Sequence, residues 1–176
     1  MKFCVSIIIS VLLLLPIAAY AFSYTKEISQ DEVQTKLDSK FPLKKKNFMI
    51  STTLSDPLVT FIGENNRVGV EMSVDFKFPA KLNGSGRINL DGSLRYDNKS
   101  GSFYFDNIKI NKLSIKDLDD EKTNSVKSLL EPIVRKALEK VPVYKFNDNF
   151  KEKLIKSSLK SIKVEKELLL VELSAF

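Results

Sequence analysis

The chain contains no histidine, and its single cysteine is Cys4, close to the N-terminus. A serine or cysteine nucleophile usually depends on a histidine base, although serine–lysine variants exist. Zinc sites are usually built from histidine and cysteine. The composition therefore excludes the commonest hydrolase and zinc chemistry, and a lone cysteine excludes an internal disulfide.

Glycine is scarce, with six residues, and none of them forms a phosphate-binding loop. Gly84 and Gly86 lie in the polar stretch 83–86, which predicts a hairpin turn, whereas a phosphate loop joins a strand to a helix. We therefore expect no cofactor.

The longest apolar run, residues 3–18, follows one lysine and precedes Ala-Tyr-Ala at 19–21. This order of charge, apolar core and small residues is typical of a signal peptide. The run is shorter than the about 20 residues of a transmembrane helix. We expect cleavage after Ala21, export to the periplasm and a mature domain of residues 22–176, with retention as an anchor as the alternative. Because Cys4 precedes the run, we do not expect a lipoprotein.

The formal net charge is +6, and the densest basic run is Lys44-Lys45-Lys46. A second, more dispersed set lies near the C-terminus: Lys151, Lys153, Lys156, Lys160 and Lys163. In an exported protein, this balance favours an anionic membrane surface or envelope polymer as partner rather than nucleic acid. Runs of this kind are most often simply solvated faces.

Apolar residues at period two predict a series of antiparallel strands. The expected strands cover 22–28, 48–54, 58–62, 68–78, 88–96, 103–115 and 162–173. Ser55-Asp56-Pro57 predicts a turn, and Gly92 a bulge or bend. The alternation of apolar and polar residues shifts at Ile108 and again at Leu113, which predicts further bulges.

Three helices are expected between these strands. Ser29 and Glu32 form a capping box before the first. Residues 126–141 are apolar over about half of the helix circumference, and Pro132 predicts a kink near Ser128. A shorter helix follows Asn147. The sequence therefore predicts an α+β fold, in which a long kinked helix packs against a strongly curved antiparallel sheet, with shorter helices near each end.

Carboxylates are the remaining resource for catalysis. Asp117, Asp119, Asp120 and Glu121 cluster before the long helix, where acidic residues also favour the helix N-terminus without any ligand. Asp91 and Asp106 lie among apolar strand residues. General acid–base catalysis of glycoside hydrolysis would need such a pair of carboxylates. We expect neither set to act in catalysis.

The surplus of apolar residues is the main positive feature. It predicts either a filled core or an apolar groove between the curved sheet and the kinked helix, which would accept a lipid. The candidate groove residues are Val70, Met72, Val74, Leu90, Leu94, Phe103, Phe105, Val126, Leu130, Ile133, Val134 and Leu138. Phe48 and Met49 fit both interpretations.

Short motifs carry a family resemblance. They are Phe41-Pro42-Leu43, Leu130-Glu131-Pro132 and, most specifically, Pro142-Val143-Tyr144-Lys145-Phe146. Over residues 22–174 the chain resembles the YceB-like bacterial envelope proteins, long grouped as a domain of unknown function. The resemblance implies a fold similar to the tubular lipid-binding (TULIP-like) superfamily. Typical members are lipoproteins, and this chain departs from them because it lacks a cysteine for lipidation at the predicted cleavage site.

Our leading hypothesis is a non-catalytic periplasmic protein that binds a hydrophobic or lipid-like ligand. A structural or interaction module with a closed core is the alternative. An enzyme that uses carboxylates, with or without a divalent metal, is the third.

Overall fold

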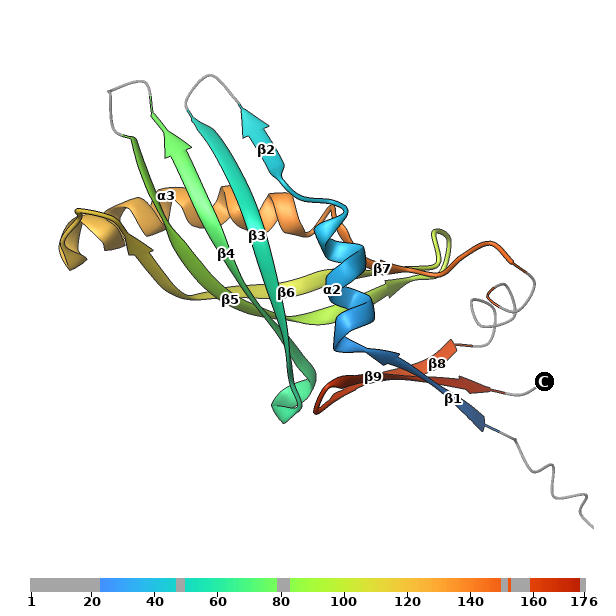
Figure 1. The fold of residues 1–176 in the computed structure, drawn as a ribbon. Coiled ribbons are helices and arrows are strands. Elements are labelled where there is room, and N and C mark those ends of the chain that lie inside the picture. The colour runs from blue at the N-terminus through green and yellow to red at the C-terminus, as the bar shows by residue number, and fades with distance from the viewer. Residues whose placement is uncertain (1–22, 47–49, 79–82, 150–151, 153–158, 175–176) are drawn as a thin grey trace, which may run out of the picture.

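The computed structural model describes residues 23–46, 50–78, 83–149, 152 and 159–174. Two antiparallel sheets and two α-helices make up most of this part of the chain (Figure 1). The predicted signal peptide lies outside the described residues, as does nearly all of the helix predicted after Asn147. Phe48 and Met49 also lie outside them.

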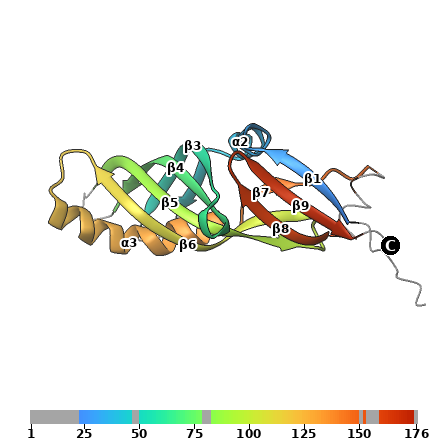
Figure 2. The ribbon, with the colours of Figure 1, turned by 90° about the horizontal axis from the view of Figure 1, so that it is seen from below.

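The larger sheet has six strands in the order β2-β3-β4-β5-β6-β7. Each strand is antiparallel to its neighbour, so the chain builds the sheet by successive reversals. The strands are β2 (Leu43–Lys46), β3 (Ser51–Ile62), β4 (Arg67–Lys77), β5 (Asn83–Asp97), β6 (Ser102–Ile115) and β7 (Pro142–Lys145). The sheet curls into a half-barrel (Figures 1 and 2).

Bulges bend this sheet where the alternation of apolar and polar residues shifts. The β5–β6 register shifts between Asn89 and Leu90 and again between Asp91 and Ser93, which confirms the bulges predicted at Gly92 and along residues 108–115. The turn predicted at Ser55-Asp56-Pro57 is wrong. The segment is a bulge inside the continuous strand β3, with Asp56 at φ 51°. An inserted residue lets a strand continue while changing its direction.

Gly84 and Gly86 lie inside β5, so the predicted turn at 83–86 is wrong. The reason is close packing. A Cβ at Gly86 would lie 2.2 Å from the Ser114 carbonyl oxygen, and one at Gly84 would lie 2.7 Å from the Phe76 ring. These glycines allow neighbouring groups to approach the backbone of β5.

The smaller sheet has three strands in the order β1-β9-β8 and lies at one end of the half-barrel (Figure 2). Its strands are β1 (Ser23–Ser29), β8 (Leu159–Glu165) and β9 (Leu168–Ser174). The single final strand predicted over 162–173 is wrong, because the chain reverses at Lys166–Glu167 into a hairpin. A short 3-10 turn, η1 (Glu64–Asn66), contacts β8 and joins the two sheets.

The first helix, α2 (Gln30–Asp38), begins at the predicted cap, where Ser29 Oγ accepts a hydrogen bond from Glu32 N at 3.1 Å. Its glutamines also complete the edge of β3. Gln34 Oε1 accepts from Val59 N at 2.8 Å, and Gln30 Oε1 accepts from Phe61 N at 2.9 Å. The helix therefore satisfies strand N–H groups that β2 is too short to reach.

The second helix, α3 (Asp120–Leu138), begins at Asp119, whose side chain accepts from Lys122 N at 2.9 Å. It is one helix through Pro132. It packs against β6 and approaches β2. No helix among the described residues is both long and apolar enough to span a membrane.

The predicted α+β class is wrong. Strands make up 59% of the described residues, so the fold is mostly β, and the curled six-stranded sheet replaces the expected long kinked helix as its organising element. The prediction underestimated the strands partly because residues 55–57 and 83–86 have the composition of turns and yet lie inside β3 and β5. β5 and β6 continue for 15 and 14 residues through their bulges.

Candidate functional site

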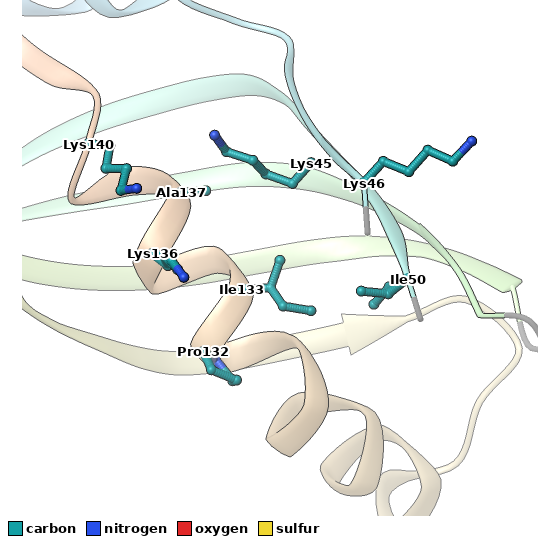
Figure 3. Close-up of a pocket in the computed structure, with 8 residues that line it drawn as sticks. All are labelled: Lys45, Lys46, Ile50, Pro132, Ile133, Lys136, Ala137 and Lys140. Atoms are coloured by element: carbon teal, nitrogen blue, oxygen red, sulfur yellow. The ribbon is translucent and has the colours of Figure 1, made fainter. Parts of the chain in front are cut away.

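An open cleft of about 360 Å³ lies between α3 and the edge of the six-stranded sheet (Figure 3). We call it the α3–β2 cleft. It is lined by Lys45, Lys46, Ile50, Pro132, Ile133, Lys136, Ala137 and Lys140. Ligand pockets in proteins typically have volumes of about 300–1,000 Å³. The cleft is thus at the small end of the range for a ligand site.

One wall of the cleft is formed at the C-terminal end of α3. Ile133, Lys136 and Ala137 are spaced to share a face of this helix, and Lys140 lies two residues beyond its end. The neighbouring stripe of this helix carries the buried residues Val126, Leu130, Val134 and Leu138. The cleft wall therefore lies beside the core-facing stripe.

The other wall of the cleft includes residues of β2, and the alternation of side chains along this strand decides which of them face inward. Lys45 is paired in register with Thr52, and Leu43 with Leu54. Since Thr52 and Leu54 are both buried, Leu43 and Lys45 belong to the inner face of β2, while Lys44 belongs to the outer face. Figure 3 shows Lys45 extending toward the Lys140 end of the cleft and Lys46 extending in the opposite direction.

The middle of the cleft is apolar. Figure 3 shows Ile133 of α3 and Ile50, just before β3, pointing toward one another across the gap. Ile50 and Ala137 are buried and Ile133 is half-buried. An alkyl group placed here would gain further burial of Ile133, which contributes about 25 cal/mol per Å² of apolar surface removed from water.

The rim is basic. Within the described part of the chain, Lys45, Lys46, Lys136 and Lys140 form no ion pair with a carboxylate. The exposure of Lys44, Lys45 and Lys46 agrees with a solvated basic run. Lysines also protect an edge strand such as β2 from pairing with other chains.

Thr52 adds a polar group on the same side of the sheet. It is 2% exposed, and its Oγ1 has no hydrogen-bond partner among the described residues. Thr52 follows Ile50 by two residues and is paired with Lys45, so it shares their side of the sheet. A buried hydroxyl without a partner is unfavourable by about 1–3 kcal/mol.

The predicted groove residues lie together and belong to one hydrophobic core. Leu94 and Ile133 are partly buried and pack against one hydrophobic core, and the other ten candidates are buried inside it. Ile133 is the one candidate that also lines the α3–β2 cleft. The candidates are therefore mainly core residues, and the open apolar surface lies at the edge of this core.

Sequence reasoning did not connect Lys45, Ile50, Lys136, Ala137 and Lys140. They come from two segments of the chain, one at and after β2 and the other at the C-terminal end of α3, which lie about ninety residues apart. The basic run at 44–46 was visible in the sequence, but nothing local to it indicates that α3 lies opposite.

A second polar cluster lies where α2 contacts β7. The Tyr144 hydroxyl donates to Glu32 Oε1 at 2.8 Å, and the Lys36 ammonium lies 4.9 Å from the Tyr144 ring centroid. Burial, together with the hydrogen bond to Glu32, raises the pKa of Tyr144 well above its usual range. The phenol therefore stays protonated, and the cluster joins α2 to β7.

Two of the carboxylates considered for catalysis, Asp119 and Asp91, have structural partners. Asp119 caps α3. Asp91 is desolvated by burial, yet hydrogen bonds from Asn111 and Arg67, with the charge of Arg67, lower its pKa below the ordinary value. Among the described residues, no group of three or more acidic side chains is arranged to hold a metal ion.

Comparison with known proteins identifies one family. A family model described as "Protein of unknown function (DUF1439)" matches residues 28–167. The comparison with curated proteins found no match. The matched range runs from the end of β1 to the turn between β8 and β9, so it includes every residue of the α3–β2 cleft.

Proposed function

The chain belongs to the DUF1439 family, whose description names no activity, so we propose a function from the structure: an exported, non-catalytic protein that binds a hydrophobic or lipid-like ligand in the α3–β2 cleft. The observation that carries the proposal is the open apolar gap between Ile133 and Ile50. Its apolar lining continues into the hydrophobic core. A ligand would therefore extend an existing apolar surface.

The resemblance to YceB-like envelope proteins and to the tubular lipid-binding fold is part of this proposal. So is export, which rests on the signal-like sequence at residues 1–21. Periplasmic localisation would place the protein among lipids and envelope polymers. The absence of histidine from the whole chain supports binding rather than catalysis.

A cleft-filling substitution tests the binding site. Wild-type protein should bind a fluorescent fatty acid such as dansyl-undecanoic acid, with enhanced emission. Ile133→Phe should abolish most of that enhancement, because Ile133 is half-buried at the cleft and a larger ring would occupy it. Leu129→Phe is the matched control: it lies on the same helix, is 52% exposed and does not line the cleft.

The alternative is an interaction module of the cell envelope with a closed core. The specific observation in its favour is that ten of the twelve predicted groove residues are buried in the core cluster. If the wild-type protein binds no fatty acid, or if Ile133→Phe binds as well as wild type does, the lipid-binding proposal fails and this alternative is favoured.

A further inference from the structure

The lysines of the α3–β2 cleft are placed to select the ligand by charge. We propose that Lys45, Lys136 and Lys140 bind the anionic head group, a carboxylate or a phosphate, of an amphiphile whose alkyl chain contacts Ile50 and Ile133. This inference rests on the proposed function, because it assigns the ligand class of the same cleft.

The first argument is the convergence of charge from two elements. Lys136 lies in the last turn of α3 and Lys140 lies two residues beyond the end of that helix, and Lys45 extends from β2 toward the Lys140 end of the cleft (Figure 3). Three ammonium groups border one end of an apolar gap. None of the three forms an ion pair within the described residues.

The second argument is the contrast with other basic residues of the chain. Lys122 is paired with Asp119 at 2.6 Å, Arg135 with Glu131 at 2.8 Å and Lys160 with Glu172 at 3.0 Å. On α3, two of the three basic residues away from the cleft therefore have acidic partners, with Lys127 as the exception, whereas Lys136 and Lys140 at the cleft have none among the described residues. Mutual repulsion among unpaired lysines is relieved when an anion binds between them.

The third argument is that the positive charge lies beside an apolar surface. A lysine ammonium group is a compact point charge that can donate hydrogen bonds to a carboxylate or to a phosphate. The cleft combines such charges with the apolar gap between Ile50 and Ile133, which matches an amphiphilic anion.

Calorimetric titration, kept below the critical micelle concentration, tests the inference with probes of one chain length. Dodecanoate and dodecyl phosphate should bind about tenfold more tightly than dodecanol, because their head groups can form partly screened charge pairs with the three lysines. Dodecyltrimethylammonium should bind most weakly. Added salt should weaken the two anions and leave dodecanol unchanged.

Matched variants assign the effect to the cleft. The triple change of Lys45, Lys136 and Lys140 to Gln should reduce the preference for dodecyl phosphate over dodecanol to near unity. Lys44→Gln combined with Lys127→Gln is the control, because Lys44 lies on the outer face of β2 and neither residue lines the cleft. That control should keep the full preference.

The outcomes separate the inference from the proposed function. If no alkyl probe binds the wild-type protein, both fail. If dodecanol binds as tightly as dodecyl phosphate and the triple variant changes neither, ligand binding stands and the charge selection is overturned. If inorganic phosphate alone binds as tightly as dodecyl phosphate, the lysines serve a free anion and the amphiphile is overturned.

Discussion

The hydroxyl of Tyr144 donates a hydrogen bond to Glu32 Oε1 at 2.8 Å and joins β7 to the first turn of α2, across 112 residues of sequence. Tyr144 is 3% exposed, and its ring also contacts Phe103 and Phe146. Glu32 was expected to return to the Ser29 backbone as the second half of a capping box. Its carboxylate instead holds the distant strand β7.

Tyr144→Phe should therefore lower the free energy of unfolding by about 1–2 kcal/mol, because it removes one hydrogen bond to a charged group and keeps the aromatic packing. Urea unfolding measures the change. Tyr104→Phe is the control, since its hydroxyl makes one long contact, 3.4 Å from Ser100 Oγ. Equal losses in the two variants would contradict the structural role of the Tyr144–Glu32 bond.

The side chain of Asn66 substitutes for a missing strand beside β8. Its Oδ1 accepts from the Val164 amide, and its Nδ2 donates to the Ile162 carbonyl at 3.2 Å. Because β8 is an edge strand of the smaller sheet, Asn66→Gly should leave the Val164 amide without a partner. Exchange of that amide with solvent should accelerate by roughly tenfold.

Two choices make this test specific. Glycine accommodates the φ of 58° at position 66, so the substitution adds no backbone strain. Asn66→Asp keeps the acceptor for Val164 and removes only the donor to Ile162, so its exchange rate should stay closer to wild type. Unchanged exchange in Asn66→Gly would show that the Asn66 side chain does not protect β8.

Gly86 marks the closest approach in the half-barrel. Gly86→Ala should destabilise the protein by about 1–3 kcal/mol, because the added methyl would lie 2.2 Å from the Ser114 carbonyl oxygen and would force β5 and β6 apart. Gly63→Ala is the control, since its nearest backbone neighbour lies 3.7 Å away. Thermal unfolding compares them, and similar melting temperatures would contradict the tight β5–β6 contact.

Stability should depend on pH through Asp91. Its pKa is lowered from the ordinary value of 3.8, so the stabilisation is complete above that value and is lost as pH falls through the folded-state pKa. The urea midpoint of the wild-type protein should therefore fall between about pH 5 and pH 2 more steeply than that of Asp91→Asn. Parallel curves for wild type and Asp91→Asn would refute the assignment.

Structural features that depend on neighbouring residues in the chain could be predicted from the sequence. The alternation of Val68 to Phe76 gives β4, and Ser29 begins α2 as expected. The reversal at Lys166–Glu167 was missed because the apolar run at 168–171 makes the flanking segments look like one strand. The sequence predicts a turn at Gly84 and Gly86 because the close approach of other strands to β5, which requires these glycines, depends on the tertiary structure.

The site was less predictable than the strands. The apolar residues proposed for a groove are the core, because apolarity alone does not distinguish a filled interior from an open one. The cleft depends on α3 lying opposite β2, a tertiary relationship between Ile133 and Ile50. Of the cleft residues, Ile133 alone belonged to the predicted set.

Photocrosslinking tests the central claim, that an alkyl chain binds between Ile50 and Ile133, most directly. A diazirine-bearing fatty acid would be irradiated on the purified protein and the labelled peptides mapped by mass spectrometry. The account predicts labels on the peptides that contain Ile50 and Ile133, suppressed by excess dodecanoate and lost in Ile133→Phe. Labels spread over the surface, or confined to the β8–β9 hairpin, would contradict it.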